Sequence, residues 1–178
     1  MQPTRRSAIT VMLGIGSGTA LYCSALDRSA WRAYEAVEEA WIRDRHALLV
    51  EQCPDCADAA AIDLELKLAE LQRRALQFEY VSKHNPRLLQ GGMWQLASIP
   101  LSDAELGKMA SASAMYRKQD ALVRRLSDTL RQHPDYDNFH RAQTRLWKTP
   151  DYHSVHRKYS GRLQELNRIF AGIEAGGL

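Results

Sequence analysis

The sequence Cys53-Pro-Asp-Cys56 is the motif in this chain whose residue types and spacing are best suited to chemistry. Two cysteines separated by two residues at the start of a helix form the reactive pair of dithiol oxidoreductases, because the helix dipole lowers the thiol pKa. Those enzymes place the pair after a β-strand, and no strand candidate precedes Cys53. We therefore favour a structural turn between two helices, closed or not by a disulfide, over a redox site.

The histidines of the last third of the chain are the candidates for metal binding. His153 and His156 are three residues apart, so that on a helix they share a face, and His140 belongs to the same basic region. Neither an HExxH motif nor a second CxxC pair completes a common metal site. These histidines are therefore minor metal-ligand candidates, and we predict no cofactor.

Other motifs with a defined chemistry are missing from the sequence. It contains no P-loop, no GxSxG elbow, and no serine, histidine and aspartate at spacings that would suggest a catalytic triad. The glycines near the amino terminus lack the spacing and the strand–helix context of a dinucleotide-binding loop. We predict that the protein is not an enzyme.

The composition is that of one globular domain. The chain has 178 residues, of which 45% are hydrophobic and 25% charged, with a formal net charge of +3. Residues 27–84 are predominantly acidic, whereas residues 131–178 are basic and hold four of the six histidines. A net charge this small is not that of a dedicated nucleic-acid-binding protein, and we predict no nucleic-acid partner.

An uncharged segment, 7–26, follows Arg5-Arg6 at the amino terminus. As a helix it would be about 30 Å long, which matches the hydrocarbon core of a bilayer. A cleaved signal peptide and a mitochondrial import sequence are alternative interpretations. We predict that residues 1–26 form a retained membrane anchor or a targeting segment, in which Gly14 and Gly18 allow close helix contact in lipid.

The rest of the sequence predicts an all-α fold, a bundle of three long and two shorter helices. Long stretches without Gly or Pro carry apolar residues at three- and four-residue steps, and Ser102 and Glu105 have the spacing of a capping box. The first two helices are predicted to form an antiparallel hairpin about the Cys53–Cys56 turn. The predicted helices cover residues 28–52, 57–84, 102–132, 135–148 and 151–171, within a helical domain at 27–172 that a disordered tail follows at 173–178.

Two further features suggest contacts with partner proteins. The connection 85–101 is apolar for a loop, and the pattern Pro-Asp-Tyr-x-x-Φ-His-Arg, where Φ is apolar, occurs at Pro134 and again at Pro150. Each copy is predicted to start a helix, with Pro in the first turn and Asp at the positive end. The interaction candidates from these segments are Met93, Trp94, Tyr136, Phe139, Tyr152 and Val155.

These observations predict a non-catalytic accessory or structural subunit of a membrane protein complex. Its partners would be membrane lipid, through the N-terminal helix, and other subunits of the assembly. The helical domain would lie on the trans side of a single-pass anchor, in the intermembrane space or the periplasm. The alternative is an exported thiol–disulfide or metal-binding helical protein, soluble in the periplasm after signal cleavage.

Overall fold

The computed structural model describes residues 15–89 and 96–175, and over these residues the protein is all-α, without a strand. For residues 15–27 and 170–175 only the helical backbone is described. The α-helices are α1 (Ile15–Gln52), α2 (Ala57–His84), α4 (Asp103–Ala112), α5 (Ala114–Arg131), α6 (Tyr136–Leu146) and α7 (Pro150–Ala175). Two short 3₁₀ helices, η1 (Pro54–Cys56) and η2 (Pro86–Leu89), follow α1 and α2.

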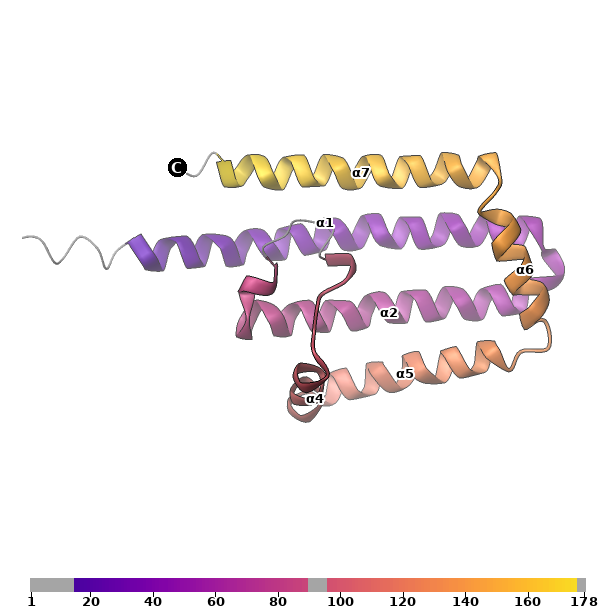
Figure 1. The fold of residues 1–178 in the computed structure, drawn as a ribbon, viewed down its shortest axis with the longest axis horizontal. Coiled ribbons are helices and arrows are strands. Elements are labelled where there is room, and N and C mark those ends of the chain that lie inside the picture. The colour runs from indigo at the N-terminus through magenta and orange to yellow at the C-terminus, as the bar shows by residue number, and fades with distance from the viewer. Residues whose placement is uncertain (1–14, 90–95, 176–178) are drawn as a thin grey trace, which may run out of the picture.

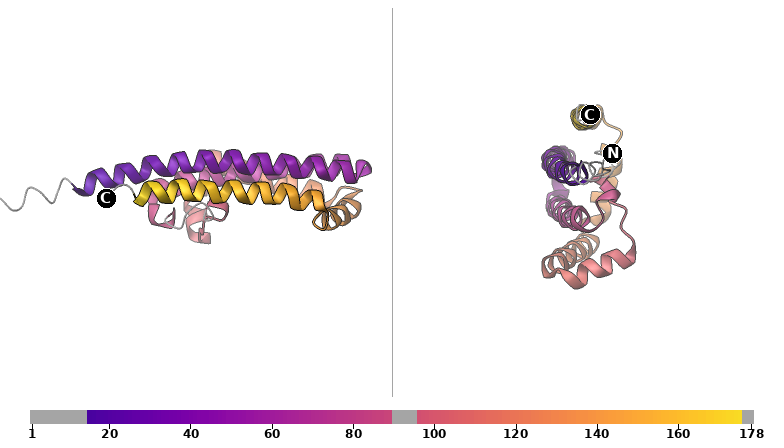
Figure 2. Two further views of the ribbon diagram at one scale, coloured as in Figure 1. Left: turned by 90° about the horizontal axis from the view of Figure 1, so that it is seen from above. Right: turned by 90° about the vertical axis from the view of Figure 1, so that its left-hand side faces the viewer.

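The four long helices lie side by side in a single row, in the order α7, α1, α2, α5 (Figure 1). The view along the helix axes in Figure 2 shows the row end-on, with α4 projecting from its α5 side. The main contacts join α1 to α2, α1 to α7 and α2 to α5, and α6 crosses the row at the end where α1 turns into α2. The long helices are therefore arranged in one layer, with α1 and α2 in the middle.

Two hydrophobic clusters follow each other along the axes of the long helices. We call the end where α1 turns into α2 the turn end, and the opposite end of these helices the open end. The first lies at the turn end, between α1, α2, α5 and α6. The second lies at the open end, between α1, α2, α7 and the segment after α2. The buried members of the first are Leu49, Cys56, Ala59, Ala60, Leu66, Ala69, Val123, Leu130, Phe139, Ala142 and Leu146. The second contains Trp31, Tyr34, Ile42, Leu71, Phe78, Val81, Leu89, Leu96 and Leu163.

The predicted helical hairpin is confirmed. The second helix has the predicted limits, Ala57 to His84, and Asn85 ends it before Pro86. The first helix ends at Gln52 as predicted but begins at Ile15, so that the backbone has no boundary near residue 28. Within the described part of the chain, no helix combines the length and apolar character needed to cross a bilayer. The predicted anchor, 7–26, begins in residues 1–14, which lie outside the described residues.

The single helix predicted over 102–132 is wrong, because the structure divides it at Ser113. Ser102 and Glu105 form the predicted capping box at the start of α4. The backbone at Ser113 is extended, and its Oγ accepts the Tyr116 N–H at 3.1 Å, which starts α5. A serine can replace a helical hydrogen bond with such a side-chain cap, and a stretch of small residues offers little packing to oppose it. The division leaves a hollow of about 410 Å³ between α2, α4 and α5.

Both copies of the Pro-Asp-Tyr pattern start a helix, as predicted. Helix α6 begins at Tyr136 and α7 at Pro150. The Thr149 Oγ1 atom accepts the Tyr152 N–H at 3.2 Å and so caps the start of α7. The two helices end at Leu146 and Ala175, against predicted ends at 148 and 171.

Candidate functional sites

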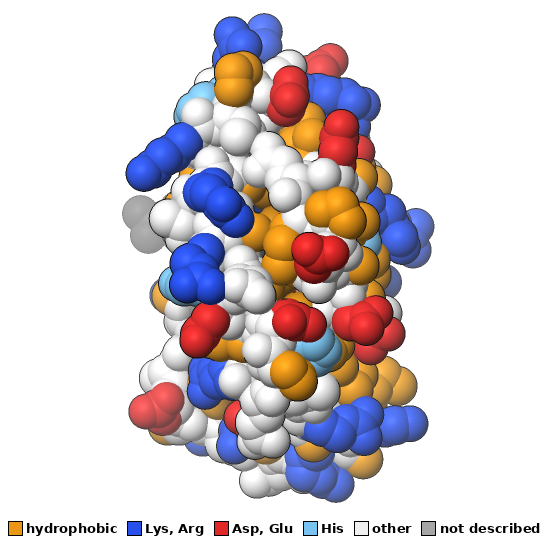
Figure 3. All heavy atoms as spheres, turned by 90° about the vertical axis from the view of Figure 1, so that its right-hand side faces the viewer, with side chains coloured by type: hydrophobic (Ala, Val, Ile, Leu, Met, Phe, Trp, Pro, Cys, Tyr) orange, Lys and Arg blue, Asp and Glu red, His pale blue; other side chains and the backbone are white. Residues whose placement is uncertain are grey.

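The Cys53–Cys56 pair lies at the turn between α1 and α2, at disulfide distance. The two sulfur atoms are 2.04 Å apart and the Cα atoms 5.3 Å apart. Cys56 is buried in the first hydrophobic cluster, whereas Cys53 is partly exposed at its edge. Figure 3 shows this end of the molecule, where side chains of both charges surround apolar ones. The pair thus closes the hairpin, and only Cys53 is placed to meet a solvent reagent.

The three candidate histidines are exposed, and each contacts an aromatic ring. His140 on α6 stacks against Tyr136, and His156 on α7 meets the ring of Trp41. His153, also on α7, has its nearest aromatic contact with Tyr152. Among the described residues, no three His, Cys, Asp or Glu side chains are grouped closely enough to hold a metal ion.

The apolar residues of the two Pro-Asp-Tyr segments pack within the chain. Phe139 is buried and Tyr136 lies against the same cluster. Tyr152 packs edge-on to Trp41 with ring centroids 5.5 Å apart, and Val155 is half-buried between α7 and α1. Internal packing therefore accounts for the apolar character of these four candidates.

The remaining interaction and anchor candidates lie where the structure describes no side chains. Met93, Trp94 and Gly14 lie outside the described residues, and Gly18 falls within the first turns of α1. The large apolar side chains that are exposed on the described surface come from other positions. They are Met115, Trp147 and Ile169, with 68%, 54% and 48% of their surface exposed.

A polar network joins α1, α2 and α7 between their packed faces. Arg74 on α2 donates from Nη1 to the Tyr34 hydroxyl at 2.8 Å and from Nη2 to Glu38 Oε1 at 3.3 Å. Arg74 also donates to the Ala97 carbonyl at 3.2 Å. The Tyr159 hydroxyl on α7 donates to Glu38 Oε2 at 2.6 Å. One carboxylate on α1 thus binds both neighbouring helices of the row.

Burial sets the protonation of the two tyrosines in this network. It raises the pKa of Tyr34 well above its ordinary value, with Arg74 opposing the shift and Glu38 adding to it. Burial also raises the pKa of Tyr159, and the hydrogen bond to the Glu38 carboxylate raises it further. Both hydroxyls therefore stay protonated, and the Tyr159 hydroxyl stays a donor, across the physiological pH range.

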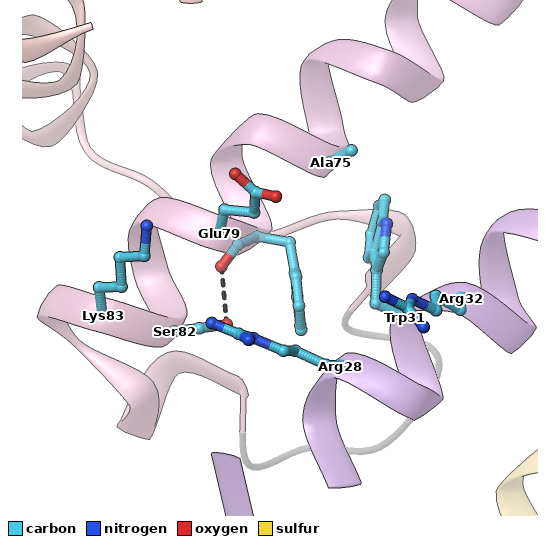
Figure 4. Close-up of a pocket in the computed structure, with 8 residues that line it drawn as sticks. Arg28, Trp31, Arg32, Ala75, Glu79, Ser82 and Lys83 are labelled. Carbon is cyan, nitrogen blue, oxygen red and sulfur yellow. Dashed lines mark hydrogen bonds between the residues drawn. The ribbon is translucent and has the colours of Figure 1, made fainter. Parts of the chain in front are cut away.

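A cavity of about 270 Å³ lies between α1 and α2 near the open end of the row (Figure 4). Its inner wall is the buried pair Trp31 and Phe78, whose rings stack with centroids 5.0 Å apart. Three exposed cationic side chains line it, Arg28, Arg32 and Lys83. We call this cavity the basic pocket.

One carboxylate also lines the basic pocket but does not neutralise it. The Glu79 carboxylate points away from Arg28 in Figure 4, while the Arg28 side chain extends from α1 toward α2. Ser82, at the same rim, uses its hydroxyl to donate to the Phe78 carbonyl at 2.8 Å. The pocket therefore combines an aromatic wall with an excess of positive charge, which suits an amphipathic anion.

Sequence reasoning missed both the network and the pocket. Some spacing signals were present: Tyr34 and Glu38, like Arg28 and Arg32, are four residues apart and share a face of one helix. The partners of Glu38 are Arg74 on α2 and Tyr159 on α7, which are 36 and 121 residues away in the sequence. Only the tertiary structure brings these three residues together.

Comparison with known proteins gives no assignment to set beside this geometry. No family model, no curated protein and no solved structure matches the chain.

Proposed function

We propose that this protein is a non-catalytic structural subunit of a membrane protein assembly. Its N-terminal segment would attach it to the membrane, and its helical domain would lie on the trans side, in a periplasm or an intermembrane space. The observation that carries the proposal is the single row of long helices, in which α1 and α2 each pack against two long helices of the described part of the chain.

A single row leaves helix faces free for other helices to pack on. The outer stripe of α1 includes Ala36 and Ala47, both exposed, and small side chains allow a partner helix to come close. Trp147 and Met115 add exposed apolar surface elsewhere. Scattered apolar residues are normal on a monomer, whereas a single layer of long helices leaves whole helix faces without a neighbour in the described part of the chain.

The cysteine pair supports the predicted compartment. Disulfides persist in the periplasm and in other oxidising spaces, and are rare in the cytosol. The backbone of α1 runs unbroken from Ile15, so the proposed anchor and the middle of the row would belong to one helix. Such a connection would fix the row relative to the membrane.

Affinity purification of the tagged full chain in a mild detergent, followed by sizing, tests the proposal. We expect defined co-purifying subunits at a constant ratio. The double variant Ala36→Gln, Ala47→Gln adds bulk to the exposed stripe of α1 and should release these subunits without lowering thermal stability. Ala121→Gln, at an exposed position of the outer helix α5, is the matched control. A monodisperse monomer without partners would contradict the proposal.

A second candidate function is exchange of the Cys53–Cys56 disulfide with a client dithiol. The partial exposure of Cys53 beside a buried Cys56 favours it, because exchange needs one accessible sulfur. In that reaction the client would be oxidised to a disulfide while Cys53 and Cys56 are reduced to thiols. Trapping a mixed disulfide with a Cys56→Ser variant would support exchange, and its absence would leave the pair a structural closure.

A further inference from the structure

We propose that the basic pocket binds the phosphate group of an anionic phospholipid, with the glycerol portion of the lipid against the aromatic wall. The proposal rests on the proposed membrane attachment for the source of the ligand. The phosphate chemistry itself rests on described residues alone: two arginines and a lysine around a cavity of about 270 Å³.

The three cations are available for a ligand. Within the described residues, neither Arg28 nor Lys83 forms an ion pair, whereas two other arginines of α2 are paired, Arg74 with Glu38 and Arg73 with Asp120. Guanidinium groups bind phosphate oxygens through paired N–H donors, and lysine adds a compact charge. The basic pocket thus holds unpaired donors of the kind that phosphate requires.

The opposing charges around the pocket are fewer than the cations. Glu79 is the one carboxylate among the lining residues, and it points away from Arg28 (Figure 4). Glu35, one turn along α1, interacts with Arg32 and offsets part of its charge. The C-terminal end of α2 carries a partial negative charge, but Lys83 and His84 lie in its last turn. An excess of positive charge remains at the rim.

The aromatic wall makes the pocket suitable for a lipid rather than for a free ion. Trp31 and Phe78 are nearly fully buried, yet both line the cavity and add apolar surface to it. A phosphate with attached glycerol and acyl carbons can use both surfaces, and tryptophan is common at the headgroup level of membranes.

The position of the pocket along α1 agrees with the headgroup layer of the proposed bilayer. Arg28 and Arg32 are two and six residues beyond Leu26, the end of the predicted anchor, or about 3 and 9 Å along a helix. A headgroup layer is about 5–8 Å thick on each side. The antiparallel α2 brings Lys83 to the same level (Figure 4).

Titration of the full chain in mild detergent tests the proposal. The probes are short-chain phosphatidylglycerol, short-chain phosphatidylcholine and glycerol phosphate. Substituting phenylalanine for Trp41, Trp94 and Trp147 leaves Trp31 as the single tryptophan, so its fluorescence reports occupancy of the pocket. The test variant is Arg28→Gln with Arg32→Gln. The matched control is Arg125→Gln with Arg131→Gln, which removes the same charge from exposed positions of α5.

We expect phosphatidylglycerol to bind in preference to phosphatidylcholine, and the affinity to fall with salt. Each removed cation should weaken binding about fivefold, and the pair about 30-fold, while the control variant changes it little. Equal weakening by both double variants would overturn the pocket as the site. Equal binding of glycerol phosphate would support the phosphate site and overturn the lipid as its source. Because no partner protein is involved, failure here and failure of the co-purification test are separate results.

Discussion

The turn end and the open end of the long helices are stabilised in different ways. At the turn end the chain reverses between α1 and α2 within a few residues, the cysteine pair closes the turn, and α6 lies across it. At the open end α1, α2 and α7 come together from distant parts of the sequence, and polar hydrogen bonds join them. Both ends therefore depend on apolar contacts between distant parts of the chain, to which the turn end adds the local closure by the cysteine pair and the open end adds a hydrogen-bonded network.

This difference agrees with a division of roles between the two ends. The first hydrophobic cluster packs aliphatic side chains and Phe139 around Cys56. The buried carboxylate of Asp63 on α2 also pairs with Arg45 on α1. The open end contains both the Tyr34–Glu38–Arg74–Tyr159 network and the basic pocket. The open end is therefore the end at which the proposed membrane attachment and the proposed lipid phosphate would meet the protein.

The largest effect is expected at the turn end, from Phe139→Ala. This ring is 2% exposed in the first hydrophobic cluster, so its removal should lower the free energy of unfolding by about 3–5 kcal/mol. Chemical denaturation measures the loss. Trp147→Ala, at the end of α6 but 54% exposed, is the control and should change stability by less than about 1 kcal/mol. Similar losses in both variants would contradict the assigned packing of α6.

The second prediction concerns the network of the open end. Glu38→Ala removes the carboxylate shared by Arg74 and Tyr159 and leaves their donors without it, at a cost of about 2–3 kcal/mol. Hydrogen exchange in α7 should speed up more than in α5. Glu39→Ala is the matched control. The Glu39 carboxylate pairs with Arg43 at the surface, and this ion pair contributes about 0.3–0.5 kcal/mol to stability. Unchanged exchange in α7 would show that the apolar contacts alone hold that helix.

The features that could be predicted from the sequence are those set by neighbouring residues. The limits of α2 follow from a long stretch without Gly or Pro that ends at Asn85-Pro86. The capping box of Ser102 and Glu105 and the two Pro-Asp-Tyr starts were also predicted, because caps act over three or four residues.

The order of the helices and the sites between them could not be predicted in this way. Periodicity shows which face of a helix is apolar but not which neighbour covers it, so α7 could not be placed beside α1. The division at Ser113 was missed because a single side-chain cap there prevails over the helical spacing of the buried residues Met109 and Tyr116, which are seven residues apart. In the sequence nothing distinguishes Arg28, Arg32 and Lys83 from other surface cations. They line one cavity only because α2 folds back along α1.

The third prediction concerns the closed turn. Reducing the Cys53–Cys56 bond should lower the free energy of unfolding by about 2 kcal/mol at most, because it closes a loop of only four residues. The thermal midpoint should fall by roughly 4–8 °C in a reductant that leaves a Cys53→Ser, Cys56→Ser variant unchanged. A larger fall would mean that the apolar packing of the turn end depends on the bond.

The fourth prediction is a loss of stability in alkali, caused by the open end. Because burial raises the pKa of Tyr34 and of Tyr159, their stabilisation is complete below the ordinary tyrosine pKa of 10.0 and is lost as the pH rises above it. Each tyrosine contributes a slope of at most about 1.4 kcal/mol per pH unit. Tyr159→Phe should remove one of the two contributions, while Trp147→Phe, which changes an exposed ring that does not titrate, should keep the wild-type slope. Identical slopes in both variants would contradict the shift at Tyr159.

The smallest effect is expected at the capping box of α4. Ser102→Ala removes the oxygen that accepts the Glu105 N–H and should lower the free energy of unfolding by about 1 kcal/mol. The backbone and hydroxyl of Ser102 both donate to the Glu105 carboxylate and lower its pKa. The contribution is therefore present above the ordinary glutamate pKa and is lost as the pH falls through the lowered value. We expect the difference between wild type and variant, measured by denaturation, to shrink in acid. Ser98→Ala, an exposed serine before α4, is the control, and a difference that does not depend on pH would contradict the role of Glu105.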